Sequence, residues 1–460
     1  MGAGVFDCLR APIHFTIYVR RTNEKRANGR ASYHEHTMSA RCLLLLALLP
    51  AATARADGLR AGAAKVDITP SVGHAMWGYS GRRDAPSVGV IDRPYARALV
   101  LEAGSERIAL VNLDLGRAPT RVYSEAIRNH VRKTAGVGTV FLVASHTHHG
   151  PVLEVDTWPN AKDSYARRLQ QKLSDVIVAA ARALEPARLG VASKETKLNR
   201  NRHSKRPEAP VDRQLLVLRV ETLTGKPIAH AVNFAAHPTM LSRTLMKLSA
   251  DYPGALAECI EKETKAPCLF LQGAAGDLSP NPPAGQETPE KFGRLLGTEV
   301  LAQIKGIRCD PLVKPTLTAK EEEFRFDCRV DVSNPVVKLA LGKAFYPDLI
   351  AFFEREYQDG VRPRLTTALL DGRIGLVGVS GEFFCAHALH LKRRARLEHL
   401  FFLGYCNDYH QYFPTIEAAA EGGYGTEPWI AAAAIGSGEK VMDRALIHLW
   451  QMRGKLKGTK

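Results

Sequence analysis

The sequence predicts a single large α/β domain in which mixed β-sheets are flanked by helices and the active site lies where strands end. Of the 460 residues, 45% are hydrophobic and 24% are charged, an ordinary composition for a globular protein with a substantial core. Several apolar strands run directly into polar loops. The length allows two or three domains, but no repeat, linker or change of composition divides the chain, which favours one.

The first half of the chain predicts hairpins and helices in succession. Residues 60–116 are expected to form strands and tight loops, with a hairpin across Gly104 and Ser105. Apolar residues recur at helical spacing over 161–184, on one face. The expected elements are strands 98–103 and 107–114, helix 119–134, strand 139–145, helix 161–184, strands 215–221 and 228–235, and helix 252–262.

The second half continues the alternation of strands and helices. A hairpin is expected around Asp371 and Gly372, and an amphipathic helix is expected close to the end of the chain. The expected elements are strand 267–272, helix 289–307, strands within 316–331, helix 336–344, strands 366–370 and 373–379, helix 381–396, strand 400–404 and helix 439–452.

Residues 38–56 have the pattern of a secretory signal peptide. A short basic segment precedes an apolar run over 42–50 and small residues that end at Ala56. The run is about ten residues long, whereas a helix needs about 20 to span a bilayer. A buried core helix is the alternative. We therefore expect 1–37 to be an upstream extension, untranslated or disordered, and 57–460 to be an exported catalytic domain, periplasmic or secreted.

The formal net charge of +16 first suggests a polyanionic partner. Residues 1–56 hold eight basic and three acidic residues, so the rest of the chain carries +11. The densest basic cluster, 392–396 (KRRAR), is expected to be a solvated helix face rather than a polyanion site. We expect peripheral contact with anionic surfaces, no nucleic-acid partner and no transmembrane segment after residue 57.

Possible metal ligands follow three of the predicted apolar strands. His146 and His148 lie at the end of strand 139–145, where alternate side chains point the same way and could face one cation. His237 and Glu382 follow two later strands. A catalytic zinc site needs three or four ligands with one position open for water, and no C-x-x-C pair offers cysteines instead. The alternatives are a hydrogen-bonded histidine loop and a helix-capping role for Glu382.

A glycine-rich turn at 276–281 (GDLSPN) follows strand 267–272. Its backbone N–H groups could approach an oxyanion, and Ser279 could bind or attack an acyl group, although the same residues are common in simple turns. Two familiar metal patterns do not fit. A metallo-β-lactamase needs H-x-H-x-D-H, but position 150 is glycine, and an amidohydrolase barrel carries H-x-H on the first strand of a regular βα series.

Taken in order, the motifs resemble the neutral/alkaline ceramidase family, in its catalytic N-terminal domain. The resemblance covers nearly all of the chain from residue 57 onward. The matching segments are 65–70 (KVDITP), 76–79 (MWGY), 92–97 (DRPYAR), 111–116 (VNLDLG), 145–151 (SHTHHGP), 198–200 (LNR), the His237 segment, 251–255 (DYPGA), 276–281 (GDLSPN), 381–383 (GEF), and 407–412 (NDYHQY) with Tyr424.

The resemblance implies one zinc ion, Zn2+. The ligands that it implies are His146, His237, Glu382 and Tyr412. Tyr412 is preferred to its rival Tyr409 because the family has a second functional tyrosine twelve residues later, which matches Tyr424. Asp114 and Asp277 are candidates to orient the ligand imidazoles, with simple structural roles as the alternative.

The resemblance also implies roles around a reacting amide. His148, Arg200 and Tyr424 match positions that surround it, and His148 or Tyr424 could stabilise an oxyanion while His148 shuttles a proton. Ser279 matches a family serine that has been considered a nucleophile. We expect a supporting role for it, because metal-activated water makes a covalent step unnecessary.

The expected function is zinc-dependent hydrolysis of the amide bond of an N-acyl lipid such as ceramide, giving a sphingoid base and a fatty acid. The alternatives are a zinc hydrolase for another amide or ester, and an inactive lipid- or surface-binding relative. Three departures lie where substrate would be contacted: His149 replaces a serine, Asn201-Arg202 replaces Ser-Pro, and Gly425 replaces an acid. The chain ends soon after Tyr424, so no C-terminal β-sandwich domain is expected.

Overall fold

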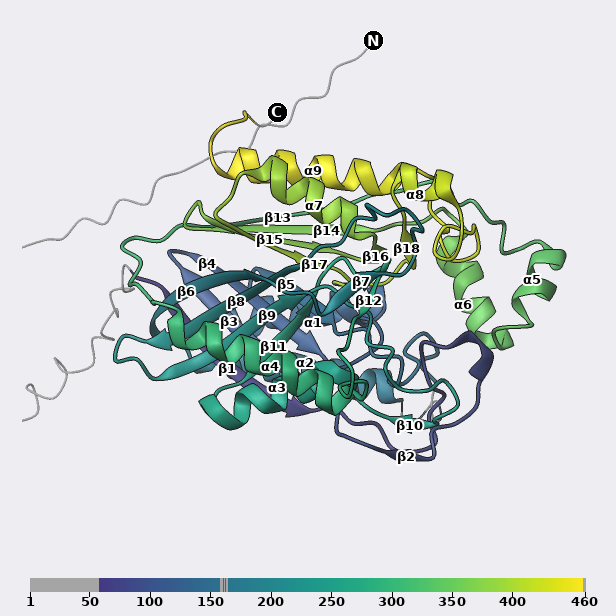
Figure 1. The fold of residues 1–460 in the computed structure, drawn as a ribbon, viewed down its shortest axis with the longest axis horizontal. Coiled ribbons are helices and arrows are strands. Elements are labelled where there is room, and N and C mark those ends of the chain that lie inside the picture. Colours follow the sequence, from purple (N-terminus) through teal and green to yellow (C-terminus); the bar gives the residue numbers. More distant parts are fainter. Residues whose placement is uncertain (1–57, 158–159, 161, 163, 458–460) are drawn as a thin grey trace, which may run out of the picture. The chain divides into compact units, whose positions relative to one another are not determined.

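The computed structural model describes residues 58–157, 160, 162 and 164–457. The predicted upstream extension and signal peptide lie outside the described residues. Two β-sheets pack face to face, and helices cover the outer face of each (Figure 1). This arrangement confirms the predicted fold class of mixed sheets flanked by helices.

The larger sheet has eight strands in the order β11-β9-β8-β6-β1-β3-β4-β5. The two outermost pairs, β11 with β9 and β4 with β5, are parallel, and the other pairs are antiparallel. The strands are β1 (Arg60–Asp67), β3 (Tyr95–Ala103), β4 (Glu106–Leu113), β5 (Thr139–Ala144), β6 (Glu185–Glu195), β8 (Gln214–Thr222), β9 (Pro227–Phe234) and β11 (Cys268–Gln272).

The smaller sheet has four strands in the order β13-β14-β15-β17, and only β15 and β17 are parallel. Three two-stranded pairs lie in the loops. The strands of the sheet are β13 (Leu317–Glu323), β14 (Arg364–Leu370), β15 (Ile374–Val379) and β17 (His399–Leu403), and the pairs are β2 (Gly89–Val90) with β10 (Lys247–Leu248), β7 (Asn199–Asn201) with β12 (Leu278–Pro280), and β16 (Glu382–Phe383) with β18 (Tyr412–Phe413).

Six helices lie over the outer faces of the two sheets (Figure 1). Four of them, α1 (Arg121–Ala135), α2 (Tyr165–Arg182), α3 (Asp251–Thr264) and α4 (Pro289–Gly306), cover the larger sheet, whereas α7 (Cys385–Ala395) and α9 (Ser437–Met452) cover the smaller one (Figure 1). The remaining helices are η1 (Ser80–Arg82), α5 (Pro335–Leu341), α6 (Pro347–Tyr357) and α8 (Ile416–Glu421). Among the described residues, no helix combines the length and the apolar character needed to cross a bilayer.

The core between the sheets explains where the functional loops meet. Leu110, Leu271 and Leu376 belong to one apolar cluster that joins both sheets. The edge strands β5 and β11 contact each other, and the Gln272 side chain donates to the Ser145 carbonyl oxygen at 2.9 Å. The loops that follow β5, β9, β11, β15 and β17 therefore converge at one end of the sandwich.

Most predicted elements are present, with several differences. The long strand β6 and the helix α6 were not predicted, and only 317–323 of the expected strands in 316–331 forms a strand. Glu382 does not open a helix as expected. It lies on the short strand β16, whose partner Tyr412 is 30 residues away in sequence, and α7 begins only at Cys385. Such a non-local pairing leaves no local pattern in the sequence.

Candidate active site

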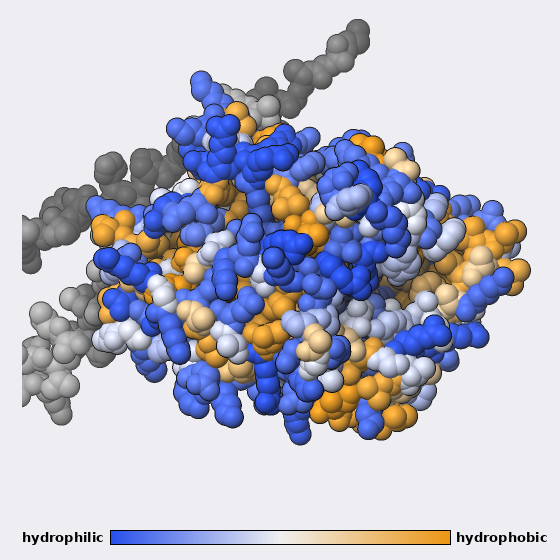
Figure 2. All heavy atoms as spheres, in the orientation of Figure 1, coloured by the Kyte–Doolittle hydropathy of each residue, from blue (hydrophilic) through white to orange (hydrophobic). Residues whose placement is uncertain are grey.

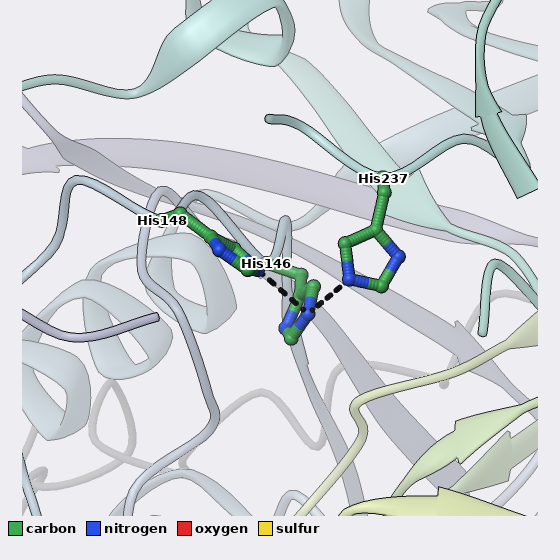
Figure 3. Close-up of side chains that lie close together, drawn as sticks. All are labelled: His146, His148 and His237. Atoms are coloured by element: carbon green, nitrogen blue, oxygen red, sulfur yellow. Dashed lines mark hydrogen bonds between the residues drawn. The ribbon is translucent and has the colours of Figure 1, made fainter. Parts of the chain in front are cut away.

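Three side chains from different strand ends meet in one buried cluster. The Nε2 atoms of His146 and His237 lie 2.9 Å apart, and Glu382 Oε2 lies 3.3 Å from each of them. His146 and His237 have no exposed surface, and Glu382 is 2% exposed. In Figure 3 the ring of His146 lies between those of His148 and His237. The cluster thus concentrates nitrogen and oxygen donors away from bulk water.

Backbone carbonyl groups fix the orientation of the two imidazoles. His146 Nδ1 lies 2.8 Å from the Gly116 carbonyl oxygen, and His237 Nδ1 lies 2.8 Å from that of Ala275. Because a carbonyl oxygen can only accept, each Nδ1 carries the proton. Each Nε2 is then left with a lone pair directed into the cluster, which is the arrangement of a metal-binding histidine.

Asp114 and Asp277, the predicted orienting carboxylates, have other partners. Asp114 accepts from the Arg97 guanidinium at 2.7 Å, and Asp277 accepts from the Cys385 backbone N–H at 2.6 Å. Their contacts are therefore structural, and the backbone does the orienting.

His148 completes a group of three histidines. Its Nε2 lies 3.4 Å from His146 Nε2, and the ligand atoms of His146, His148 and His237 all lie within 4.8 Å of one another. Burial, with the nearby His146 and Arg202, lowers the pKa of His148 well below its usual range. The shift favours the neutral form of the His148 imidazole.

The Glu382 carboxylate is held by tyrosine hydroxyls. Tyr409 donates a short hydrogen bond to Oε1, and the Tyr405 hydroxyl lies 3.5 Å from Oε2. Burial opposes ionisation of Glu382, but its contact with His146 and the hydrogen bond from Tyr409 outweigh this effect, so the pKa of Glu382 is lowered. The carboxylate remains charged in an environment that favours a bound cation.

The two tyrosines considered as ligands have different surroundings. Tyr409 contacts Glu382, whereas Tyr412 lies parallel to the His237 ring at 6.5 Å and accepts a 3.1 Å hydrogen bond from Arg202. Tyr424 is 63% exposed and lies edge-on to Tyr412 at 5.7 Å. The choice of Tyr412 as the ligand stays a prediction.

The arginine that reaches the cluster is Arg202 and not the predicted Arg200. Arg200 is exposed on β7, where it is opposite Ser279. The chain turns after Asn201, which places Arg202 Nη2 3.0 Å from the Gly276 carbonyl oxygen and 3.2 Å from His237 Nε2. The sequence contains two consecutive Asn-Arg pairs, at 199–200 and 201–202. Aligning the family motif with the second pair instead of the first would have pointed to Arg202.

His149, one of the residues that depart from the family pattern, contacts groups outside the histidine cluster. Its Nε2 lies 3.0 Å from an Arg82 guanidinium nitrogen, and its Nδ1 lies 2.9 Å from the Lys247 carbonyl oxygen. Arg82 also donates to the His148 carbonyl oxygen and, at 2.8 Å, to that of Arg243. The pair therefore anchors the histidine loop to the 241–248 segment, a contact that no local sequence signal indicates.

A cavity of about 610 Å³ opens onto the cluster. Its polar side is formed by His148, Arg202, Glu382, Tyr409, Tyr412 and Tyr424. Neither Arg200 nor Ser279 is among the described residues that line it. The cavity is also lined by the apolar residues Met76, Val152, Ala344, Phe345, Leu349, Phe353, Trp429 and Ile430. It can thus receive a molecule that carries both a polar group and an apolar chain.

Comparison with known proteins decides the family. Residues 59–291 match the sequence profile of the family described as neutral/alkaline non-lysosomal ceramidase, N-terminal. The chain belongs to this family. The match includes His146 and His237, whereas Glu382 and the tyrosines lie beyond it.

Individual ceramidases are similar to parts of the chain. The neutral ceramidase of Pseudomonas aeruginosa is 31% identical over 277 residues, and neutral ceramidase B of Dictyostelium discoideum is 27% identical over 173 residues. These regions are 52% and 31% of this chain but only 39% and 24% of those proteins. Crystal structures of the Pseudomonas aeruginosa neutral ceramidase and of a ceramidase complexed with C2 each match with a TM-score of 0.70 and 20% identity, over 88% of this chain and 76% of the other. The structural likeness shows a shared fold.

The donor set fits a metal ion. In a tetrahedral zinc site with bonds of about 2 Å, ligand atoms lie about 3.3 Å apart. In the cluster, His146 Nε2 lies 2.9 Å from His237 Nε2 and 3.4 Å from His148 Nε2, and Glu382 Oε2 lies 3.3 Å from the Nε2 atoms of His146 and His237. A buried group that could hold a metal ion is therefore part of this ceramidase-family fold.

Proposed function

We propose that the protein is a zinc-dependent hydrolase that cleaves the amide bond of an N-acyl lipid of the ceramide type, releasing a sphingoid base and a fatty acid. The observation that carries this proposal is the pair of imidazole lone pairs and the carboxylate that converge beside a half-apolar cavity. The names of the similar proteins, both neutral ceramidases, support the choice of substrate.

We assign the zinc ion to His146, His237 and Glu382, with Tyr412 as the fourth ligand. Mixed nitrogen and oxygen donors favour zinc over magnesium or calcium, which prefer oxygen alone. When bound, the ion would polarise the scissile carbonyl and lower the pKa of the attacking water.

The remaining polar residues of the site transfer the proton and stabilise the developing negative charge. Neutral His148 accepts a proton from the water that adds to the carbonyl carbon and passes it to the nitrogen as the C–N bond breaks. The Arg202 guanidinium and the Tyr424 hydroxyl, both on the cavity wall, donate to the oxygen on which negative charge develops. We assign Ser279 a supporting role, because it is not among the described residues that line the cavity.

The apolar residues that line the cavity favour a substrate that carries a lipid chain. Leu349 and Phe353 of α6 line the cavity together with Trp429 and Ile430. Burying an alkyl chain there contributes about 0.8 kcal/mol per CH₂ group. A short soluble amide would not use this binding energy.

A substrate panel tests the proposal. The full chain is loaded with zinc and offered a fluorescent short-chain ceramide, a simple N-acyl amide and an ester with the same fluorophore. We expect the ceramide to be hydrolysed best, and Glu382→Gln to lower its kcat/KM by about 100-fold or more. Glu354→Gln on the outer side of α6 is the matched control. Turnover of the amide or ester without the ceramide would assign the site to a different substrate.

We also propose peripheral contact with anionic surfaces through α5. Val336 and Leu339 on this helix are 75% and 74% exposed, and Lys338 and Lys343 accompany them. Figure 2 shows apolar side chains gathered over α5 and α6. Co-sedimentation with phosphatidylglycerol vesicles should exceed that with phosphatidylcholine vesicles and should fall for Lys343→Glu. Equal sedimentation with both lipids would argue against this contact.

Export remains a further proposal, supported by the signal-peptide pattern of residues 38–56. The six described cysteines are all unpaired, so the described fold does not depend on disulfides. N-terminal sequencing of the protein from a periplasmic or culture fraction should start near Asp57. An intact sequence starting at Met1 or Met38 would contradict cleavage.

A further inference from the structure

A second cluster of ligand side chains lies outside the histidine site. Glu356 of α6 and Asp408 and His410 of the β17–β18 loop each offer one ligand atom, and these three atoms lie within 4.8 Å of one another. His410 has no exposed surface, Asp408 is 4% exposed, and the Glu356 side chain is 18% exposed.

His410 is the unusual member of this cluster. Neither of its ring nitrogens has a hydrogen-bond partner among the described residues, and Nε2 lies 3.5 Å from Asp408 Oδ2. Leaving a buried polar group without a partner costs about 1–3 kcal/mol. Native proteins therefore rarely do so unless a water molecule or an ion supplies the contact.

The charges around the cluster favour a cation. Arg117 contacts Asp408 at 2.8 Å but is shared with Glu154, and Arg121 lies 3.5 Å from Glu356 but is closer to Glu323. Two groups of ion pairs meet at the cluster: Arg117 with Glu154 and Asp408, and Arg121 and Arg364 with Glu125, Glu323 and Glu356. Each group has one carboxylate more than it has guanidinium groups, and Glu125 and Glu323 are the solvent-exposed members. Asp408 and Glu356 are more buried and lie beside the imidazole, where a cation would stabilise their charges.

We propose that Glu356, Asp408 and His410 bind a second divalent transition-metal ion, separate from the one assigned to His146 and His237. One imidazole nitrogen with two carboxylate oxygens suits Zn2+ or Mn2+, with water completing the coordination.

The position of this second site gives it a structural role. Asp408 and His410 flank Tyr409, whose hydroxyl donates to Glu382. Glu356 lies on α6, which also carries Leu349 and Phe353 of the cavity wall. An ion at this place ties the cavity wall to the loop that holds Glu382, without contacting the substrate.

Zinc stoichiometry tests the proposal on the full chain. After saturation with zinc alone and dialysis, we expect two equivalents for the wild type and one for His410→Ala. The exposed His390→Ala is the matched control and should keep two. The double variant His146→Ala/Glu382→Ala should keep one equivalent, which the added change His410→Ala removes. This design separates failure of the second site from failure of the first.

A milder variant guards against misfolding. Glu356→Gln keeps the shape of the side chain and should lose one equivalent while its circular dichroism spectrum matches that of the wild type. Zinc should raise the melting temperature of His146→Ala/Glu382→Ala but not of the triple variant, because only the former still binds the ion. If His410→Ala and Glu356→Gln both hold as much zinc as the wild type, the proposal is overturned and the cluster is an ion-pair network only.

Discussion

The Nε2 atoms of His146 and His237 face each other at 2.9 Å, although each ring already donates its Nδ1 proton to a backbone carbonyl oxygen. Two lone pairs at this distance repel unless the nitrogen atoms share a proton or bind a metal ion. The carboxylate of Glu382 beside them adds negative charge to the same place. This relationship is the physical basis of the metal assignment.

Replacing Arg202 and Arg200 by alanine, one at a time, tests which of them acts at the site. Arg202→Ala should lower kcat/KM for a fluorescent ceramide by about 100-fold, because a donor to the developing negative charge is lost. Arg200→Ala should stay within about twofold, because Arg200 is exposed on β7. Steady-state kinetics on both variants provides the comparison. A large loss in Arg200→Ala with little effect of Arg202→Ala would restore the residue expected from the sequence.

The two tyrosines can be separated by zinc affinity. Tyr412→Phe should weaken zinc binding more than Tyr409→Phe, because we assign Tyr412 to the metal and Tyr409 to the support of Glu382. Loss of a hydrogen bond that supports a metal ligand typically lowers metal affinity about 10- to 100-fold, and we expect a loss of about this size for Tyr409→Phe. Competition with a chromogenic chelator measures both affinities. The opposite order would make Tyr409 the ligand.

A substitution at Gly116 tests the packing of Trp77 against His146. A Cβ atom at this position would lie 2.2 Å from the ring of Trp77, which packs edge-on against His146 at 5.0 Å and Tyr409 at 5.3 Å. Gly116→Ala should therefore lower the free energy of unfolding by about 1–3 kcal/mol and reduce activity. Urea unfolding gives the first quantity. Gly58→Ala is the control, because its Cβ would meet nothing within 4 Å.

His230 provides a test of acid stability away from the site. Burial, with the nearby Arg219, lowers its pKa from 6.5 to about 4, and neither ring nitrogen has a hydrogen-bond partner among the described residues. Between about pH 6.5 and pH 4, His230 is protonated in the unfolded chain but neutral in the folded chain. Stability from this residue is thus complete above pH 6.5 and falls, by up to about 3 kcal/mol, as the pH drops toward 4.

The matching experiment compares His230→Leu with the wild type in urea unfolding at pH 7.5, 6 and 4.5. The variant should lose less stability than the wild type on acidification. Parallel losses in both proteins would show that the pKa of His230 is the same in the folded and the unfolded chain.

The sequence predicted the fold class and the two histidines because both depend on local patterns. Long apolar strands that end in His146 and His237 can be read directly, and the geometry of strand ends brings them together. Glu382 was found but was assigned to a helix, because its strand pairing with Tyr412 is non-local. Helix α6 was missed, although Pro347 at its start and apolar residues at helical spacing mark it.

The features that the sequence could not predict are contacts between distant segments. Arg202 reaches His237 only because the chain turns after β7, and His149 finds Arg82 across 67 residues. The second cluster joins Glu356 to His410 in the same way. Propensity and periodicity describe neighbours along the chain, and they carry no information on such pairs.

The central claim, a zinc ion at His146, His237 and Glu382 that supports amide hydrolysis, is tested most directly by the zinc content of the His146→Ala/Glu382→Ala double variant. The account predicts that this variant, folded as judged by circular dichroism, holds one zinc equivalent fewer than the wild type and does not hydrolyse the fluorescent ceramide. A double variant that binds as much zinc as the wild type would contradict it.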